Sequence, residues 1–283
     1  PGGCSQYGWE PGMNWWCFSQ PGTAWTWQWQ PLIGVWLVIV LLVWVYRRVL
    51  SRTDDSYESS RLRKSRRVAF ALAIVLLWAS LDWPLGPLGA SYLASVHMVQ
   101  FLVVGIAAPA LLLLALPTAA YEPLRRYPRL IKALSDLTHP VSAFFIFNIV
   151  MTVTHWPGVV DLLMPTQMGS FVLDIAWMLG GLIFWWPLIV PVPERPGFHP
   201  LGKIAYLALN AFLIRPPFAM MIFSESPIYA IYELAPPPAR DALNDQQLAG
   251  AVMKIGSAWI MFAGVLVIFR HWMLAESDRP ESA

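Results

Sequence analysis

The stretch Ser95-Val-His-Met-Val-Gln-Phe-Leu-Val-Val-Gly-Ile-Ala-Ala-Pro109 decides how this chain folds. It is apolar enough to lie inside a lipid bilayer, yet it carries His97, Met98 and Gln100 within one helical turn. A polar side chain at membrane depth is costly, so its presence there is a hypothesis of function. Imidazole and thioether groups are ligands that suit Cu(I). The other apolar segments decide whether this hypothesis holds.

The composition is that of a membrane protein. Of the 283 residues, 57% are hydrophobic and only 13% are charged, about half of the ~25% that is typical of a soluble domain. Many of the 16 tryptophans lie near the ends of apolar runs, as in an interfacial aromatic belt. The sequence contains no nucleic-acid-binding patch, phosphate loop or dinucleotide fingerprint, so we expect a lipid bilayer and no nucleic acid as its surroundings. The chain begins at Pro1 without a methionine, and a removed leader stays open.

Seven apolar runs are long enough to cross the ~30 Å hydrocarbon core of a bilayer. Because lipid offers the backbone no hydrogen-bond partners, each run is predicted to be helical. The predicted fold is an all-α, polytopic bundle of seven transmembrane helices within residues 31–270. A Trp-, Gly- and Pro-rich segment, 1–30, precedes the bundle, and a tail, 271–283, follows it. The predicted spans are residues 31–46, 67–83, 92–116, 140–155, 168–190, 201–223 and 247–270.

The basic residues fix the predicted orientation of these spans. Sixteen of the 19 lysines and arginines fall on one side of the bundle, and the positive-inside rule makes that side the cytoplasm. The N-terminus is then outside and the C-terminus is cytoplasmic, as an odd number of spans requires. The basic residues on the cytoplasmic side are Arg47, Arg48, Arg52, Arg61, Arg63, Lys64, Arg66, Arg67, Arg125, Arg126, Arg129, Lys132, Arg195, Lys203, Arg270 and Arg279.

In this orientation, polar side chains and methionines from five helices gather in the outer third of the membrane. We expect them to line a polar chamber that opens outwards, with Arg215 lying deeper in the sixth span. The residues of this chamber are His97, Met98, Gln100, His155, Asp174, Met220, Met221, Asp245, Gln246, Gln247, Met253 and Lys254.

Several of these residues also have a plainer interpretation. His97 alone is more typical of a hydrogen-bonded interior histidine than of a metal ligand, and His155, at a helix end, is more typical of an interfacial group. Methionine commonly fills gaps between apolar helices. Cys4 and Cys17 lie on the outer side, where disulfides persist, so a Cys4–Cys17 bridge is favoured over a pair that relays copper.

The charged groups at membrane depth need partners, because a lone charge there costs about 2–3 kcal/mol. The simplest prediction is that Asp174 and Lys254 form an ion pair, which would bring the fifth and seventh spans into contact. Arg215 precedes Pro216 and Pro217, which break the helix and free carbonyl groups. Its guanidinium is predicted to bind those carbonyls or, alternatively, a carboxylate or haem propionate of a partner.

Four local strings resemble the CtaG family of cytochrome c oxidase assembly factors. They are His-Met-Val-Gln at 97–100 with Ala-Pro at 108–109, Thr-His-Trp-Pro-Gly-Val-Val-Asp at 154–161, Gly-Leu-Ile-Phe-Trp-Trp-Pro at 181–187, and Asp-Gln-Gln-Leu-Ala-Gly-Ala-Val-Met at 245–253. The likeness extends over residues 27–269. It implies a multi-pass protein of the bacterial inner (plasma) membrane that helps to mature a terminal haem–copper oxidase, by copper insertion on the outer side. Terminal oxidase subunits would be its partners.

The chain departs from the family pattern where the resemblance implies metal ligands. The family has histidines at the positions of Phe101, Ser170 and Asp174, and an aromatic residue at that of Lys254. The candidate Cu(I) ligands that remain are His97, Met98, His155 and Met253. A lysine ammonium beside copper would weaken such a site, so copper is expected to be transient or lost.

Two functions therefore stay open. One is an assembly factor that binds Cu(I) and passes it to an oxidase. The other is an accessory subunit, permanently bound to an oxidase or related respiratory complex, whose metal site is degenerate. A transporter is a weaker interpretation, because the sequence has no inverted repeat. The sequence shows no nucleophile–base pair, so we do not expect an enzyme.

Overall fold

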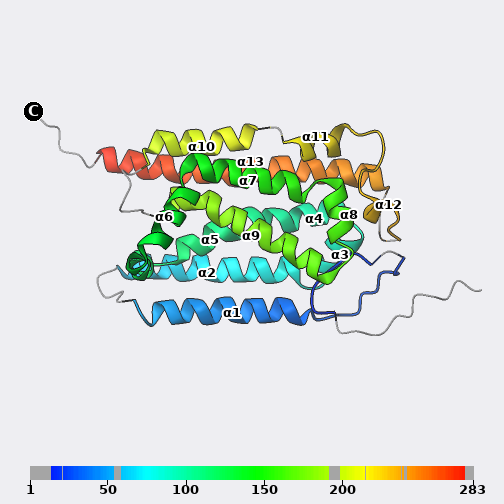
Figure 1. Ribbon diagram of the computed structural model, residues 1–283, viewed down its shortest axis with the longest axis horizontal. Coiled ribbons are helices and arrows are strands. Elements are labelled where there is room, and N and C mark those ends of the chain that lie inside the picture. The colour runs from blue at the N-terminus through cyan, green and yellow to red at the C-terminus, as the bar shows by residue number, and fades with distance from the viewer. Residues whose placement is uncertain are drawn as a thin grey trace, which may run out of the picture.

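The computed structural model describes residues 14–20, 22–53, 59–190, 198–213, 215–236, 238 and 241–277. Every regular element within these residues is a helix. The long helices lie side by side along one direction and form a bundle, whose long axis is horizontal in Figure 1.

Five helices are long and apolar enough to cross a membrane, and two bent pairs pass the same test. The five are α1 (Ile33–Leu50), α4 to α5 (Ala94–Ala115), α9 (Gln167–Ile189), α10 to α11 (Pro200–Phe223) and α13 (Ala242–Ser277). The pairs are α2 (Ser60–Leu81) with α3 (Leu85–Ser91), bent by 49°, and α6 (Pro128–Leu137) with α7 (Pro140–Thr154), bent by 67°. The prediction of an all-helical fold is confirmed for the described residues, and each of the seven predicted runs overlaps one of these five candidate spans or two bent pairs.

Short helices close the two ends of the bundle. α3, α8 (Pro157–Leu163) and α12 (Ala230–Glu233) lie at one end, beside the segment that leads into α1. The 3-10 helix η2 (Thr118–Arg126), α6 and the end of α13 lie at the other (Figure 1). The segment before α1 and the end of α13 are therefore at opposite ends of the bundle. Which side of the membrane each end faces stays a prediction.

The third span is irregular at its centre. α4 (Ala94–Phe101) continues into a π-helix, η1 (Leu102–Ala107), and then into α5 (Ala108–Ala115). Pro109 has no N–H with which to continue the α-helical ladder, and the Ile106 carbonyl accepts a hydrogen bond from the Trp185 indole at 2.9 Å. Such π-turns often mark functional sites. Hydropathy does not predict the π-helix η1.

α9 lies inside the bundle and packs against α5, η1 and α7. Gly180 and Gly181 are buried on α9, and a side chain on Gly181 would overlap the Gly105 carbonyl oxygen and Pro109. The two glycines therefore let neighbouring helices approach α9 closely. This packing brings Trp177 of α9 beside His97 of α4 and His155 at the end of α7.

Candidate functional site

A small enclosed cavity, which we call the histidine cavity, lies between α4, the end of α7, α9 and α11. His97 and Met98 line it from α4, and His155 follows α7. Trp177 of α9 and Met221 of α11 also line it. The volume of the cavity is about 10 Å³, which leaves room for roughly one water-sized atom.

His155 presents an unpartnered nitrogen in this region. Its Nδ1 lies 2.8 Å from the Met151 carbonyl oxygen, so Nδ1 carries the proton and donates it. Its Nε2 is then a lone-pair acceptor, and this atom is buried without a hydrogen-bond partner. The ring is held by stacking on Trp177, at 5.3 Å between centroids, and by the edge of Phe101, at 4.8 Å. An imidazole fixed through Nδ1 with a free Nε2 is the arrangement usual for metal-binding histidines.

His97 is held in the same tautomer by Gln100. Its Nδ1 lies 3.0 Å from Gln100 Oε1, while Gln100 Nε2 donates to the carbonyls of Ser80 and Leu85 at 2.8 and 3.1 Å. Those donations fix the amide so that its oxygen faces the imidazole. Nδ1 of His97 therefore donates, and Nε2 holds the lone pair. Gln100, predicted as a chamber residue, orients His97 and does not line the cavity itself.

The segment between α11 and α13 covers the histidine cavity. Tyr229 and Tyr232 line it, and their hydroxyls donate to the carbonyls of His155 and Gly89 at 2.7 and 2.6 Å. Asp161 accepts from the backbone N–H groups of Ala230 and Ile231, at 3.3 and 3.4 Å, and so holds α12 against α8. We call residues 228–233 the tyrosine lid.

Of the three predicted chamber residues at the start of α13, Asp245 and Gln246 are structural supports. Asp245 accepts hydrogen bonds from the backbone N–H and the hydroxyl of Ser95, which fixes the start of α4. Gln246 accepts from the Ile228 N–H at 2.7 Å and donates to the Met221 carbonyl at 3.3 Å. It therefore ties the tyrosine lid to α11. Gln247 is half-buried, and its side chain has no hydrogen bond within the described residues.

The sulfur donors at the cavity differ in part from the predicted ones. Met98 and Met221 line the histidine cavity, whereas Met253, one of the four candidate ligands, is buried in the apolar core and does not line it. The register of α13 explains the difference, because Ala249, one turn earlier, occupies the wall that Met253 was expected to supply. Among the described residues, no group of three His, Cys, Asp or Glu side chains could hold a metal. Any metal here would depend on imidazole and thioether together.

The predicted Asp174–Lys254 ion pair is wrong, because each group has another partner. Asp174 Oδ2 accepts from the Trp16 indole N–H at 2.8 Å. Lys254 Nζ donates to the carbonyls of Ala211 and Leu213 at 2.7 and 3.0 Å. These carbonyls end α10 just before the proline break, where the helix leaves acceptors unpaired. Lys254 thus caps α10 and does not line the histidine cavity.

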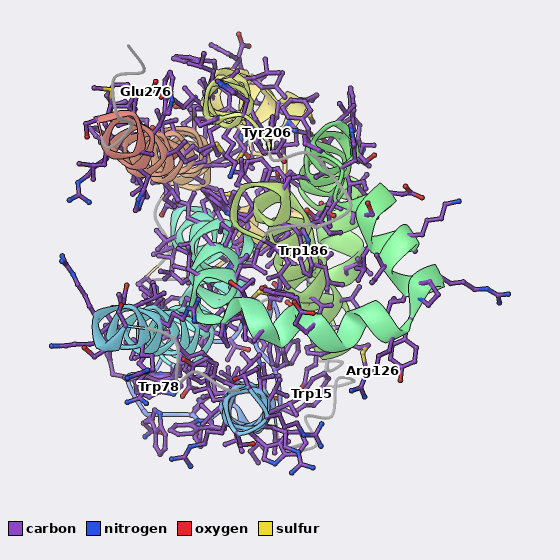
Figure 2. All side chains as sticks on the ribbon, turned by 90° about the vertical axis from the view of Figure 1, so that its left-hand side faces the viewer. Trp15, Trp78, Arg126, Trp186, Tyr206 and Glu276 are labelled. Atoms are coloured by element: carbon purple, nitrogen blue, oxygen red, sulfur yellow. The ribbon has the colours of Figure 1, made fainter. Side chains whose placement is uncertain are left out.

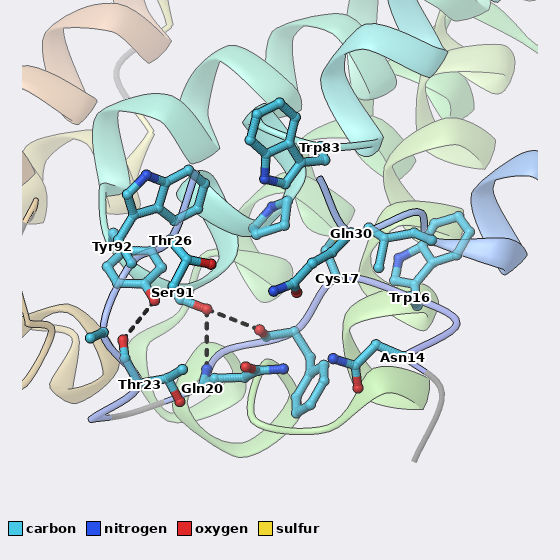
Figure 3. A pocket seen from close by; sticks show the side chains of 15 residues that line it. Asn14, Trp16, Cys17, Gln20, Thr23, Thr26, Gln30, Trp83, Ser91 and Tyr92 are labelled. Carbon is cyan, nitrogen blue, oxygen red and sulfur yellow. Dashed lines mark hydrogen bonds between the residues drawn. The ribbon is translucent and has the colours of Figure 1, made fainter. Parts of the chain in front are cut away.

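Residues 14–20 and 22–32, which we call the N-terminal strap, pack on the bundle end instead of forming a separate extension. The backbone N–H groups of Trp15 and Trp16 donate to Gln167 Oε1 at 2.8 and 3.2 Å. Figure 3 shows the pocket beneath the strap, where the Ser91 hydroxyl donates to the Phe18 carbonyl and accepts from the Gln20 N–H. Hydropathy could not locate this segment, because its anchors are individual hydrogen bonds.

Cys17 lies within the N-terminal strap as a buried thiol that is free within the described residues. Cys4 lies outside those residues, so the Cys4–Cys17 bridge stays a prediction. Burial raises the pKa of the Cys17 thiol well above its usual value, and the charges of Asp174 and Asp82 raise it further. The thiol is therefore protonated at neutral pH, unlike a copper-relay thiolate.

Arg215 is buried and is held by side chains of its own chain. Its Nε donates to Asn148 Oδ1 at 2.7 Å, and its Nη2 donates to the side-chain and backbone oxygens of Asn210. The guanidinium also lies 5.7 Å from the centre of the Phe147 ring. The prediction of a structural role is consistent with these bonds, although two asparagine side chains supply most of the acceptors.

The helical bundle and the histidine cavity define a class: a multi-pass membrane protein that encloses a small pocket of imidazole and thioether groups. In comparisons with known proteins, residues 40–275 match the model of the cytochrome c oxidase caa3 assembly factor (Caa3_CtaG) family. The chain belongs to this family, and the predicted resemblance is confirmed. No curated protein and no solved structure matched the chain. The role of the family is the assembly of an oxidase, which is not itself a catalytic role.

Proposed function

We propose that this protein assists cytochrome c oxidase assembly by holding Cu(I) as cargo in the histidine cavity. The observation that carries the proposal is the buried Nε2 of His155, which has no hydrogen-bond partner in a cavity that also contains His97, Met98 and Met221. A buried polar atom without a partner is costly, and a bound cation would satisfy this one. Two neutral imidazoles and two thioethers suit a soft, singly charged ion.

This donor set remains although Phe101 and Asp174 stand where the family has histidines. Phe101 packs edge-on against His155, and Asp174 binds Trp16, so both positions support the walls of the site. Lys254 is directed to the end of α10, and its charge therefore does not oppose a cation in the cavity. These contacts favour a working copper site with fewer ligands than the family pattern over a degenerate site that binds no metal.

Entry and release of the ion require the tyrosine lid to move. The lid closes the cavity through the bonds of Tyr229 and Tyr232 to backbone carbonyls, and it lies at the bundle end opposite the basic connecting segments (Figure 1). By the positive-inside rule, that end faces away from the cytoplasm. In the proposed function the protein lies in the bacterial plasma membrane and delivers copper at the outer face to a terminal oxidase.

The proposal is tested in cells that lack this protein, complemented with wild type, His155→Ala or His139→Asn. His139 is exposed at the start of α7, at the opposite end of that helix from His155, and asparagine keeps an N-cap there, so this variant is the control. We expect His155→Ala, expressed at wild-type level, to give oxidase deficient in copper, while His139→Asn restores it. If His155→Ala restores copper fully and the protein co-purifies with oxidase at a fixed ratio, the alternative of a permanent accessory subunit is correct.

A further inference from the structure

A second, much larger hollow lies near the bundle end that carries the basic connecting segments. It runs between α5, α9, α10 and α13, and its volume is about 1080 Å³. Leu111 and Leu114 of α5 and Val267 of α13 form apolar walls, and Trp185 contributes to its floor. Sites for small molecules are usually ~300–1,000 Å³ in volume and mostly apolar. We call this hollow the α5–α13 groove.

One end of the groove carries basic side chains. His199, at the N-terminus of α10, and His271, on α13, both line it and are exposed. Lys203 lines it as well, and its Nζ donates to the Leu188 carbonyl at 2.9 Å, which leaves two ammonium protons for another acceptor. The positive end of the α10 dipole lies at the same place. Glu276 is the one acidic residue among the lining side chains.

The remainder of the groove is apolar over a long distance. On α13 the apolar lining extends from Ile260 to Ile268, about 12 Å at 1.5 Å per residue. This length is close to the ~15 Å that half of a hydrocarbon core would occupy. Figure 2 looks onto the basic end of the bundle, where Glu276, Tyr206 and Trp186 lie on three neighbouring helices.

We propose that the α5–α13 groove binds an anionic phospholipid. The phosphate lies against Lys203, His199 and His271, and an acyl chain runs along the apolar walls towards the middle of the membrane. Basic pockets between transmembrane helices on the cytoplasmic side are where anionic headgroups bind. A zwitterionic lipid would match the walls equally well, but its headgroup would gain less from the basic end.

The test compares lipid retention by native mass spectrometry after the purified protein has been exchanged into equal amounts of phosphatidylglycerol and phosphatidylcholine. We expect wild type to retain phosphatidylglycerol preferentially. Lys203→Gln keeps a donor for the Leu188 carbonyl but removes the charge, and it should lower this preference about fivefold, since a basic residue near anionic lipid is worth ~1 kcal/mol. Lys132→Ala, at an exposed position on α6, is the matched control and should change nothing.

A second variant tests the apolar part of the groove independently of its basic end. Ala263→Trp, at an exposed lining position, should reduce retention of both lipids, because the indole fills space that an acyl chain would occupy. Equal retention of both lipids by wild type would overturn the proposal, as would unchanged selectivity in Lys203→Gln. A photoreactive group at Val267 that captures a protein subunit in native membranes, and no lipid, would also overturn it and would assign the groove to a partner helix.

Discussion

The hydrogen bond between Trp16 and Asp174 is the most informative single contact for the packing of the N-terminal strap. It joins an indole N–H and a carboxylate oxygen at 2.8 Å, and the exposed fractions of the two residues are only 2% and 8%. Trp16→Phe removes the donor but retains an aromatic ring. Asp174→Leu removes the charge and the acceptor.

The double-mutant cycle of these two changes isolates the bond. A hydrogen bond to a charged group contributes about 1.5–3 kcal/mol, and burial of both partners places this one near the middle or top of the range. We therefore expect Trp16→Phe to destabilise the wild type by about 2 kcal/mol more than it destabilises the Asp174→Leu variant. The effect of Asp174→Leu alone is not diagnostic, because it removes a buried charge as well as a bond.

The free energy of unfolding is measured by reversible titration with SDS in mixed micelles, followed by circular dichroism. A parallel cycle of Asp174→Leu with Lys254→Met is the control. Because Lys254 binds carbonyls at the end of α10, its coupling to Asp174 should be within about 0.5 kcal/mol of zero. A large Asp174–Lys254 coupling with a negligible Trp16–Asp174 coupling would refute the assignment of Trp16 as the partner of Asp174.

Two further predictions concern close packing and thiol chemistry. Gly181→Ala should destabilise the protein by about 3 kcal/mol, because its Cβ meets the Gly105 carbonyl and overpacking against backbone is not easily relieved. Gly158→Ala, which meets nothing within 4 Å, should be neutral or slightly stabilising in the same SDS titration, and equal losses for both would contradict the close approach of α9 to η1. In a Cys4→Ser background, Cys17 should react with maleimide at pH 8 only after unfolding, since its raised pKa keeps the thiol protonated; rapid labelling of the native protein would count against its burial.

The helices could be predicted from sequence because their signal is carried by whole segments. Runs of about 20 apolar residues are long enough to cross a bilayer as helices, and all seven correspond to a helix or a bent pair in the structure. The π-helix at 102–107 was not predictable in this way. It depends on Pro109, which has no N–H to donate, and on the Trp185 indole, which donates to the Ile106 carbonyl from a second helix. Hydropathy does not contain that information.

The candidate site was predictable only in part, for a related reason. His97, Met98 and His155 could be placed at one depth, and the structure brings them to one cavity. The choice of Met221 over Met253 depends on the depth of the cavity along α13, because Ala249 lines the cavity and Met253 lies one turn further along the same helix face. The partner of Asp174 was missed because it comes from the N-terminal strap, where nothing in the composition distinguishes Trp16 from the neighbouring tryptophans.

The most direct test of copper binding is a Cu(I) titration of the purified protein in competition with a chromophoric chelator. Wild type and His139→Asn should each bind one Cu(I) per chain. His155→Ala and His97→Ala should each lose most of that affinity, and Met253→Leu should retain it because Met253 does not line the histidine cavity. If wild type binds no Cu(I), or if His155→Ala binds it as tightly as wild type, the histidine cavity is not a copper site.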